Sequence, residues 1–376
     1  MQHHETETEP RLPTHTPLLQ MLDRTLLAEI EKATKEHCFS DDEVEALIAR
    51  CISLGHAELL DDFKARAPDQ LAAMREDNEG FRSRCYERWR EPMDLLWMLW
   101  ITAQEIGEAH AHEGPNGTDP LVFDTLAHLH PRALLITSEI MCLLEGGFAD
   151  GALTRWRSLH ETVVTAMFIA KHGHEVARDY RSSIWFENHK AAVALNAVAE
   201  RANMQPFSEA EFADIEAMRD KAEAHIGRRL RGEWDWASSV FARDRIKFID
   251  LERNVGLDHW RPRYKWASQH VHSAFRRPGE LLGMVEAKEP MFQIGPSNSG
   301  FIDPLHMTAI SLSQMTAAFL LHGEPNLDRL VYVKIIQTLA SDIGDSAARV
   351  EKESLEKHRA QNCVETVTSE EGSPDR

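Results

Sequence analysis

Apolar residues recur every three or four positions along most of this chain, which is the spacing of one face of an α-helix. The pattern is fullest over residues 148–171, a mostly apolar segment that carries four ionisable residues in its middle. The same spacing predicts further helices over 17–30, 40–55, 75–112, 131–147, 175–203, 208–226, 261–275, 305–322 and 326–357. The segment 289–304 fits either a small hairpin or an ordered loop. We therefore expect an all-α fold with at most one short β-hairpin.

Local signals predict where several of these helices begin and end. Ser40 followed by acidic residues is typical of a helix start, and Gly55 is typical of a helix end. Pro131 suits the first position of a helix that Gly146 and Gly147 close.

The predicted helices form one multi-helix domain over residues 17–357. Within it, the segment around Pro92 is one long helix or two helices joined near that proline. The polar ends of the chain, residues 1–16 and 358–376, lack an apolar pattern, and we expect them to be disordered.

Charge and composition limit the possible partners. The formal net charge is -19, which disfavours nonspecific binding to DNA because an acidic protein repels phosphate backbones. The longest strongly apolar run, residues 95–101, is shorter than the roughly 20 residues that span a bilayer. The five scattered cysteines suit a reducing compartment. We expect a cytoplasmic protein without a membrane partner; a homodimer is compatible with the sequence, but nothing in it specifies one.

The chain carries no motif for a bound cofactor or metal. It has no glycine-rich phosphate loop, no nucleophile elbow and no zinc helix with paired histidines. We therefore expect no cofactor and no metal ligands.

The segment 148–171 holds four ionisable residues in its centre. At about 100° per residue, His160 lies within the apolar arc, and Arg157 and Glu161 lie along its edge one turn apart. Arg155 points off the opposite flank. Ionisable groups on a core helix are costly unless they are paired, so the segment is either a buried polar network or a site.

Two other segments place polar groups beside aromatic ones. In residues 260–275, Tyr264 lies on an apolar face with Ser268 and His272 at its edge, and we expect His270 on the opposite, wet side. These groups are either structural or part of a site.

The connector 225–239 combines three arginines with two tryptophans, Trp234 and Trp236. It is either a base-stacking basic patch or a solvated loop whose tryptophans pack in the core.

Arg155 and His160, with four residues between them, resemble in spacing the Arg/His motif of the all-α HEPN-domain ribonucleases. That resemblance implies metal-independent chemistry on an RNA 2′-hydroxyl, with His as acid or base and Arg as the phosphate-binding cation. Trp156 stands where the motif usually has a polar residue, and the two side chains diverge by about 140° around a helix.

A second resemblance covers roughly residues 80–325. An RSLHE helix is followed by Asp179-Tyr180, by the EWDW connector at 233–236, and by a Tyr–Ser–Val–His segment over 264–272. This order is similar to the uncharacterised bacterial domain-of-unknown-function family 5677, and Arg88-Trp89 also fits it.

The family resemblance implies a helical cytoplasmic protein, and such proteins are sometimes suspected of defence or toxin–antitoxin roles. Its recurring polar positions fall on six residues of this chain: Arg157, Glu161, Tyr180, Tyr264, Ser268 and His272. His160 stands at a position that is usually apolar in the family, which favours Arg157/Glu161 over Arg155/His160.

Two hypotheses follow. In the first, Arg157, Glu161 and His272 are catalytic residues that act without metal on RNA or a nucleotide, and Arg155 and His160 are the weaker candidates. Tyr180, Trp236, Tyr264 and Ser268 would then bind the ligand. In the second, the protein is a non-catalytic binding or scaffold module, and the same polar residues form a buried structural network.

Overall fold

The computed structural model describes residues 40–371 except 242, 244, 272–274, 276, 288–290 and 325. The predicted tail at 1–16, the helix at 17–30 and His272 therefore lie outside the described residues. The chain divides into two compact units, residues 1–81 and 82–376, and each is described by itself.

The first long element is α2 (Asp41–Glu113). It begins directly after Ser40, as predicted, and the backbone and hydroxyl of Ser40 donate to the Glu43 carboxylate. The helix continues through Gly55, so the predicted end there is wrong. A glycine inside a helix costs only about 1 kcal/mol relative to alanine, and good helix formers surround this one.

The second unit begins within α2, just before a bend at Trp89. The backbone there leaves the helical region, with φ −102° and ψ 16°. Pro92 explains the bend, because it lacks an N–H and its ring crowds the carbonyl four residues earlier, that of Arg88. The sequence left open one long helix or two helices joined near Pro92. The structure has features of both, since α2 is one continuous element with two helical arms that meet at the bend.

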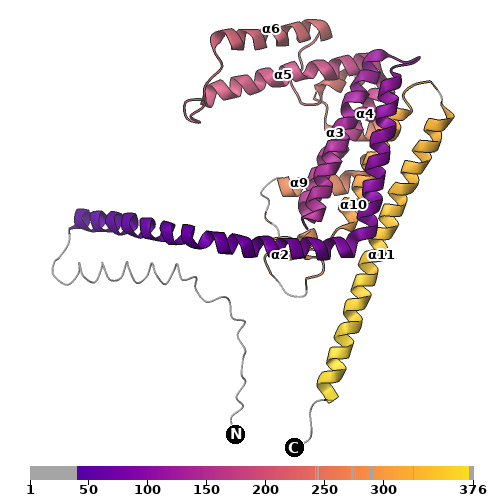
Figure 1. Cartoon of the computed structure of the whole chain (residues 1–376). Helices are drawn as coiled ribbons and strands as arrows, with labels where there is room; N and C mark the ends of the chain where they lie inside the picture. The colour runs from indigo at the N-terminus through magenta and orange to yellow at the C-terminus, as the bar shows by residue number, and fades with distance from the viewer. Residues whose placement is uncertain are drawn as a thin grey trace, which may run out of the picture. The chain divides into compact units, whose positions relative to one another are not determined.

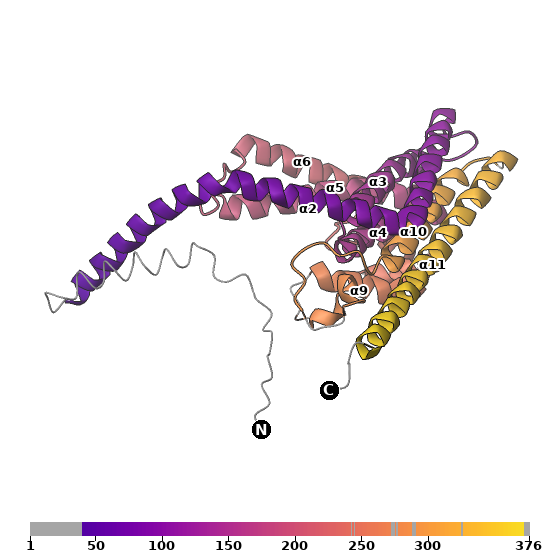
Figure 2. The ribbon, with the colours of Figure 1, turned by 60° about the horizontal axis from the view of Figure 1, so that its bottom comes forward.

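Four helices build the centre of the second unit (Figures 1 and 2): α3 (Pro120–Glu145), α4 (Ala149–His172), α10 (Ile302–Leu320) and α11 (Leu327–Glu371). The helix α3 begins eleven residues before Pro131, which is a correction. Asp119 accepts the N–H groups of Leu121 and Val122 and caps the helix ahead of Pro120. The helix α11 also extends past the predicted end at 357, to Glu371.

A helical pair, α5 (His174–Val198) and α6 (Glu209–Ile226), continues from α4. Ser208 and Glu211 form the predicted capping box at the start of α6. Short elements follow: η1 (Asp235–Ala237), α7 (Ser238–Phe241), α8 (Phe248–Val255), η2 (Asp258–Trp260), α9 (Arg261–Val271), η3 (Pro278–Glu280) and η4 (Leu282–Met284).

No strand occurs in the part of the chain that the structure describes, which confirms the all-α prediction. Residues 291–300 form a loop, so the ordered-loop alternative holds for that segment.

The helix α4 is the core of the second unit, because it contacts α3, α10, α9, α8 and α5. Its apolar side chains are buried almost completely, and Trp156 donates from its indole to the Met307 carbonyl and the Ser311 hydroxyl of α10. The segment with the fullest apolar pattern is thus the most enclosed helix.

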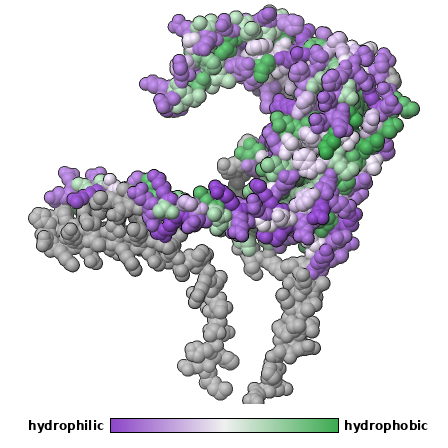
Figure 3. All heavy atoms as spheres, viewed as in Figure 1, coloured by the Kyte–Doolittle hydropathy of each residue, from purple (hydrophilic) through white to green (hydrophobic). Residues whose placement is uncertain are grey.

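Apolar side chains also reach the surface of the second unit, where hydrophilic and hydrophobic areas alternate (Figure 3). None of the described helices has a stretch long and apolar enough to cross a membrane.

Candidate functional site

One cluster on the edge of α4 joins two of the predicted catalytic residues to a tyrosine of α9. Arg157 donates from Nε to Oε1 of Glu161 at 3.0 Å, and the Tyr264 hydroxyl donates to the same oxygen. The Arg157 guanidinium carbon lies 4.9 Å from the centre of the Tyr264 ring. The side chains of Arg157 and Glu161 are about one quarter exposed, at 26% and 25%. We call these three residues the open cluster.

The groups of the open cluster shift one another's pKa values. The neighbouring Glu161 carboxylate outweighs partial burial and raises the pKa of Arg157. Burial and the hydrogen bond to Glu161 raise the pKa of Tyr264, so its hydroxyl keeps its proton at neutral pH. Glu233, an exposed residue of the connector, lies within electrostatic range, and burial and Glu161 raise its pKa. The cluster therefore holds a cation, a carboxylate and a neutral hydroxyl.

His160 belongs to a different cluster, sealed in the core one turn from Arg157. Its Nε2 lies 3.0 Å from Oε1 of Glu252 in α8, and both side chains are fully buried. Arg261 donates to the other oxygen of Glu252 at 2.8 Å. We call His160, Glu252 and Arg261 the sealed cluster. Because no solvent reaches His160 and Glu252, this arrangement suits a structural role.

Arg155 leaves α4 on another flank and pairs with Glu139 of α3. His160 faces α8 instead. The structure therefore does not bring the Arg155/His160 combination together, because residues five apart on a helix point about 140° away from each other.

The predicted binding residues Tyr180 and Trp236 lie in a row of aromatic rings. Trp236 is buried, and its ring centre lies 5.2 Å from that of Tyr180. The row continues through Trp234 and Phe248 to Tyr264, with ring centres 4.9–6.3 Å apart. For Trp236 the core-packing alternative holds, because a ring that is 2% exposed cannot stack on a base.

The connector arginines do not form one basic patch. Arg228 pairs with Asp179, a fully buried carboxylate of α5, whereas Arg229 and Arg231 are exposed.

Of the other predicted polar residues of α9, only His270 differs from the prediction. The hydroxyl of Ser268 donates to the carbonyl of Tyr264 in its own helix at 2.7 Å. His270 is not on a wet side: its Nε2 lies 3.2 Å from Oδ1 of Asp150, and its side chain is 14% exposed. The expectation failed because α4, which supplies Asp150, packs against this side of α9.

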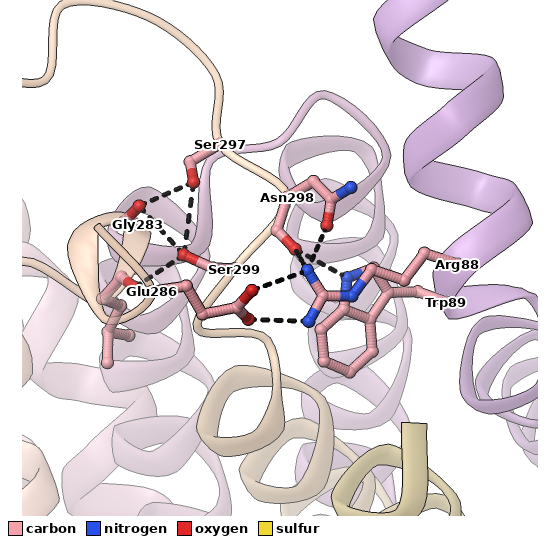
Figure 4. Close-up of polar contacts among 8 residues, drawn as sticks. Arg88, Trp89, Gly283, Glu286, Ser297, Asn298 and Ser299 are labelled. Atoms are coloured by element: carbon pink, nitrogen blue, oxygen red, sulfur yellow. Dashed lines mark hydrogen bonds and ion pairs between the residues drawn. The ribbon is translucent and has the colours of Figure 1, made fainter. Parts of the chain in front are cut away.

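A further polar centre holds that loop against the bend of α2 (Figure 4). Arg88 binds both carboxylate oxygens of Glu286 and donates to the backbone and side-chain oxygens of Asn298. Trp89 donates to the same backbone oxygen at 3.0 Å and stacks on Phe301. Arg88 and Trp89 thus anchor Glu286, Asn298 and Phe301 against the bend of α2.

Sequence reasoning missed the partners that come from distant segments, namely Glu252, Arg261, Asp150 and Glu286. Glu252 and Asp150 lie near helix starts or short polar stretches, where acidic residues are common. No local pattern distinguishes them from surface residues. No group of three or more His, Cys, Asp or Glu within the described residues is arranged to hold a metal ion.

Comparison with known proteins gives one match. Residues 123–289 match the family described as "Family of unknown function (DUF5677)", which confirms the predicted resemblance over a shorter range than expected. The matched segment contains α4, α8, α9 and both clusters. No curated protein and no solved structure matches the chain.

Proposed function

We propose that the open cluster binds the phosphate of a nucleotide or of RNA, and that the protein acts there as a metal-independent phosphate-ester hydrolase. The observation that supports this proposal is the convergence of a guanidinium, a carboxylate and a hydroxyl at a partly exposed position of the central helix. Arginine suits phosphate, because its planar fork of five N–H donors matches phosphate oxygens.

Each group has a role in this proposal. Arg157 gives one of its N–H groups to Glu161, and the others remain to hold a phosphate. Glu161 accepts the proton of the attacking hydroxyl, whose oxygen forms the new bond to phosphorus while the bond to the leaving oxygen breaks. Glu233, with its raised pKa, gives the leaving oxygen a proton. Arg157 stabilises the charge that develops on phosphorus-bound oxygens.

The test compares Arg157→Gln with Arg155→Gln. Both arginines lie on α4 and pair with a glutamate, but only Arg157 belongs to the open cluster. Hydrolysis of single-stranded RNA and of nucleotides is measured by product analysis, with thermal melting of each variant alongside. We expect Arg157→Gln to lose at least about 100-fold in rate, as when an oxyanion-stabilising donor is removed, and Arg155→Gln to keep the rate. Equal rates for both variants would refute the proposal.

A defence or toxin role is part of the same proposal at the level of the cell. A protein that cleaves RNA slows the growth of the cell that expresses it. Expression of the wild type should therefore reduce bacterial growth, and Arg157→Gln should restore it at equal protein levels. Unchanged growth with the active wild type would argue against this role.

The alternative, a non-catalytic scaffold module, also has a specific observation in its favour. The polar groups of the open cluster bind one another, and the His160–Glu252 pair of the sealed cluster is closed to solvent. In this case Arg157→Gln and Glu161→Gln lower the melting temperature, and neither the variants nor the wild type hydrolyse phosphate esters.

A further inference from the structure

A cavity of about 500 Å³ lies at the N-terminal end of α4. This volume is within the range of small-molecule sites. Its described lining comes from α4, from α9 and from the segment 279–285, and consists of Asp150, Leu153, Trp266, Gln269, His270, Gly279, Glu280, Leu281, Leu282 and Val285. Neither the open nor the sealed cluster contributes to it.

The polar side of the cavity is held in place by the backbone. Asp150 accepts the N–H groups of Leu282 and Gly283 at 3.0 and 3.1 Å, and it binds the His270 imidazole at 3.2 Å. The carboxylate therefore holds the Nε2 edge of the imidazole ring.

The loop behind this wall is fixed as well (Figure 4). The Gly283 carbonyl accepts the hydroxyls of Ser297 and Ser299 at 2.6 and 2.9 Å. Gly300 has φ +78°, and a Cβ atom there would come within 2.2 Å of the Leu282 carbonyl oxygen. Only glycine fits such a position. The cavity wall is thus pre-organised and needs no ligand to form.

The chemistry of the lining suits a flat, uncharged ring system. Trp266 offers an aromatic face and is 56% exposed, while Leu153 and Val285 add apolar contacts. Gln269 and His270 make the lining partly polar. Among the described lining residues there is no lysine or arginine, whereas Asp150 and Glu280 are acidic. A phosphate is therefore disfavoured inside the cavity, and a stacked heteroaromatic ring is favoured.

The cavity and the open cluster both lie along the line of contact between α4 and α9, which we call the seam. Asp150 pairs with His270, and Glu161 with Tyr264, so the two helices run antiparallel. Asp150 and Arg157 are seven residues apart, which places them within about 20° around the helix and about 10 Å apart along it. A single ligand can therefore contact both places.

We propose that this cavity binds the base of the nucleotide whose phosphate Arg157 holds, so that the seam is one nucleotide-binding groove. This inference rests on the proposed function for the phosphate end only. The base comes from a free nucleotide or from single-stranded RNA, since both present the same ring, sugar and phosphate.

The experiment separates the two ends of the groove. The full chain is titrated by calorimetry with the four ribonucleosides, the four ribonucleoside 5′-monophosphates, inorganic phosphate and a single-stranded RNA oligomer. Trp266→Leu tests the base end and Arg157→Gln the phosphate end. The matched controls are Trp185→Leu, another partly exposed tryptophan on α5, and Arg155→Gln. Melting curves show that each variant is folded.

We expect at least one nucleoside to bind the wild type, and Trp266→Leu to weaken its binding at least tenfold while Arg157→Gln leaves it unchanged. The corresponding monophosphate should bind more tightly and respond to both variants. Binding of monophosphates alone, sensitive to Arg157→Gln but not to Trp266→Leu, would overturn the base site and leave the proposed function standing. Nucleoside binding that depends on Trp266, with monophosphates insensitive to Arg157→Gln, would overturn the phosphate site instead. Tighter binding of the oligomer than of any monophosphate identifies RNA as the source of the base.

Discussion

Two polar clusters on α4 lie within one turn of each other and differ mainly in their contact with water. The sealed cluster places His160 and Glu252 at zero exposure, and the open cluster leaves Arg157 and Glu161 about one quarter exposed. Both contain a carboxylate that accepts from an arginine, and both arginines lie within 5 Å of the Tyr264 ring centre. Similar residue types therefore serve in two different environments.

The difference shows how burial distinguishes polar groups with a structural role from polar groups that can bind a ligand. A buried charge that loses its partner has no water to replace it, so His160 and Glu252 depend on their partners, whereas Arg261, at 27% exposure, can still reach water. A partly exposed charge can exchange its partner for water or for a ligand at a modest cost. The open cluster is for this reason the better candidate for binding, and the sealed cluster fixes α8 and α9 against α4.

The largest expected effect comes from removing the centre of the sealed cluster. Glu252→Ala leaves His160 and Arg261 without their shared acceptor, and we expect the free energy of unfolding to fall by about 3–5 kcal/mol. Glu161→Ala, the matching change in the open cluster, should cost about 2 kcal/mol, because it removes the acceptor of the Tyr264 hydroxyl but leaves Arg157 within reach of water. Urea unfolding curves of both variants measure the difference. Equal losses would show that exposure does not distinguish the clusters.

A smaller effect is expected from Tyr264→Phe, which removes the hydroxyl that donates to Glu161. At neutral pH the loss should be about 1–2 kcal/mol, as for a hydrogen bond to a charged group. The pKa of Tyr264 is raised in the folded protein, so above about pH 10 the unfolded chain gives up this proton first. The native state then holds more protons, and its stability falls as the pH rises.

The stability difference between the wild type and Tyr264→Phe should therefore shrink above about pH 10. Unfolding curves at neutral and alkaline pH measure it, and Tyr332→Phe, an exposed tyrosine of α11, is the control. A constant difference across this range would contradict the raised pKa.

The smallest effect is expected at the second arginine–glutamate pair of α4. Arg155 and Glu139 are 37% and 42% exposed, and exposed pairs contribute about 0–1 kcal/mol. We expect Arg155→Gln to change the free energy of unfolding by no more than about 0.5 kcal/mol. In high salt, which screens exposed charges, even this change should disappear. A loss comparable to that of Glu252→Ala would mean that position on α4, and not burial, sets the energetics.

Much of the fold could be predicted from the sequence. The spacing of apolar residues gave α4 within one residue at each end, and the Ser208 capping box gave the start of α6. The errors were at Gly55 and Pro131, where a residue that often ends or begins a helix lies inside one. At Pro131 the packing of α3 outweighs a local cost of about 3 kcal/mol, and at Gly55 good helix formers on both sides outweigh a cost of about 1 kcal/mol.

The candidate site was predicted only in part. Helical geometry alone placed Arg157 beside Glu161, and the order of the motifs pointed to Tyr264. The roles of these residues stay predictions, and His272 lies outside the described residues. The Asp150–His270 pair was missed because its members are 120 positions apart in the chain and no local pattern relates them.

The sequence by itself determined the helical class, the central position of α4 and the face on which each of its polar residues lies, because these follow from a period of 3.6 residues. Only the tertiary structure decided which polar residues are sealed and which are open. Exposure depends on what packs against a helix, and α8, α9 and η4 reach α4 from more than 75 residues away in the chain. His160 and Arg157 are one turn apart on α4, and His160 is the one that Glu252 and Phe248 of α8 cover.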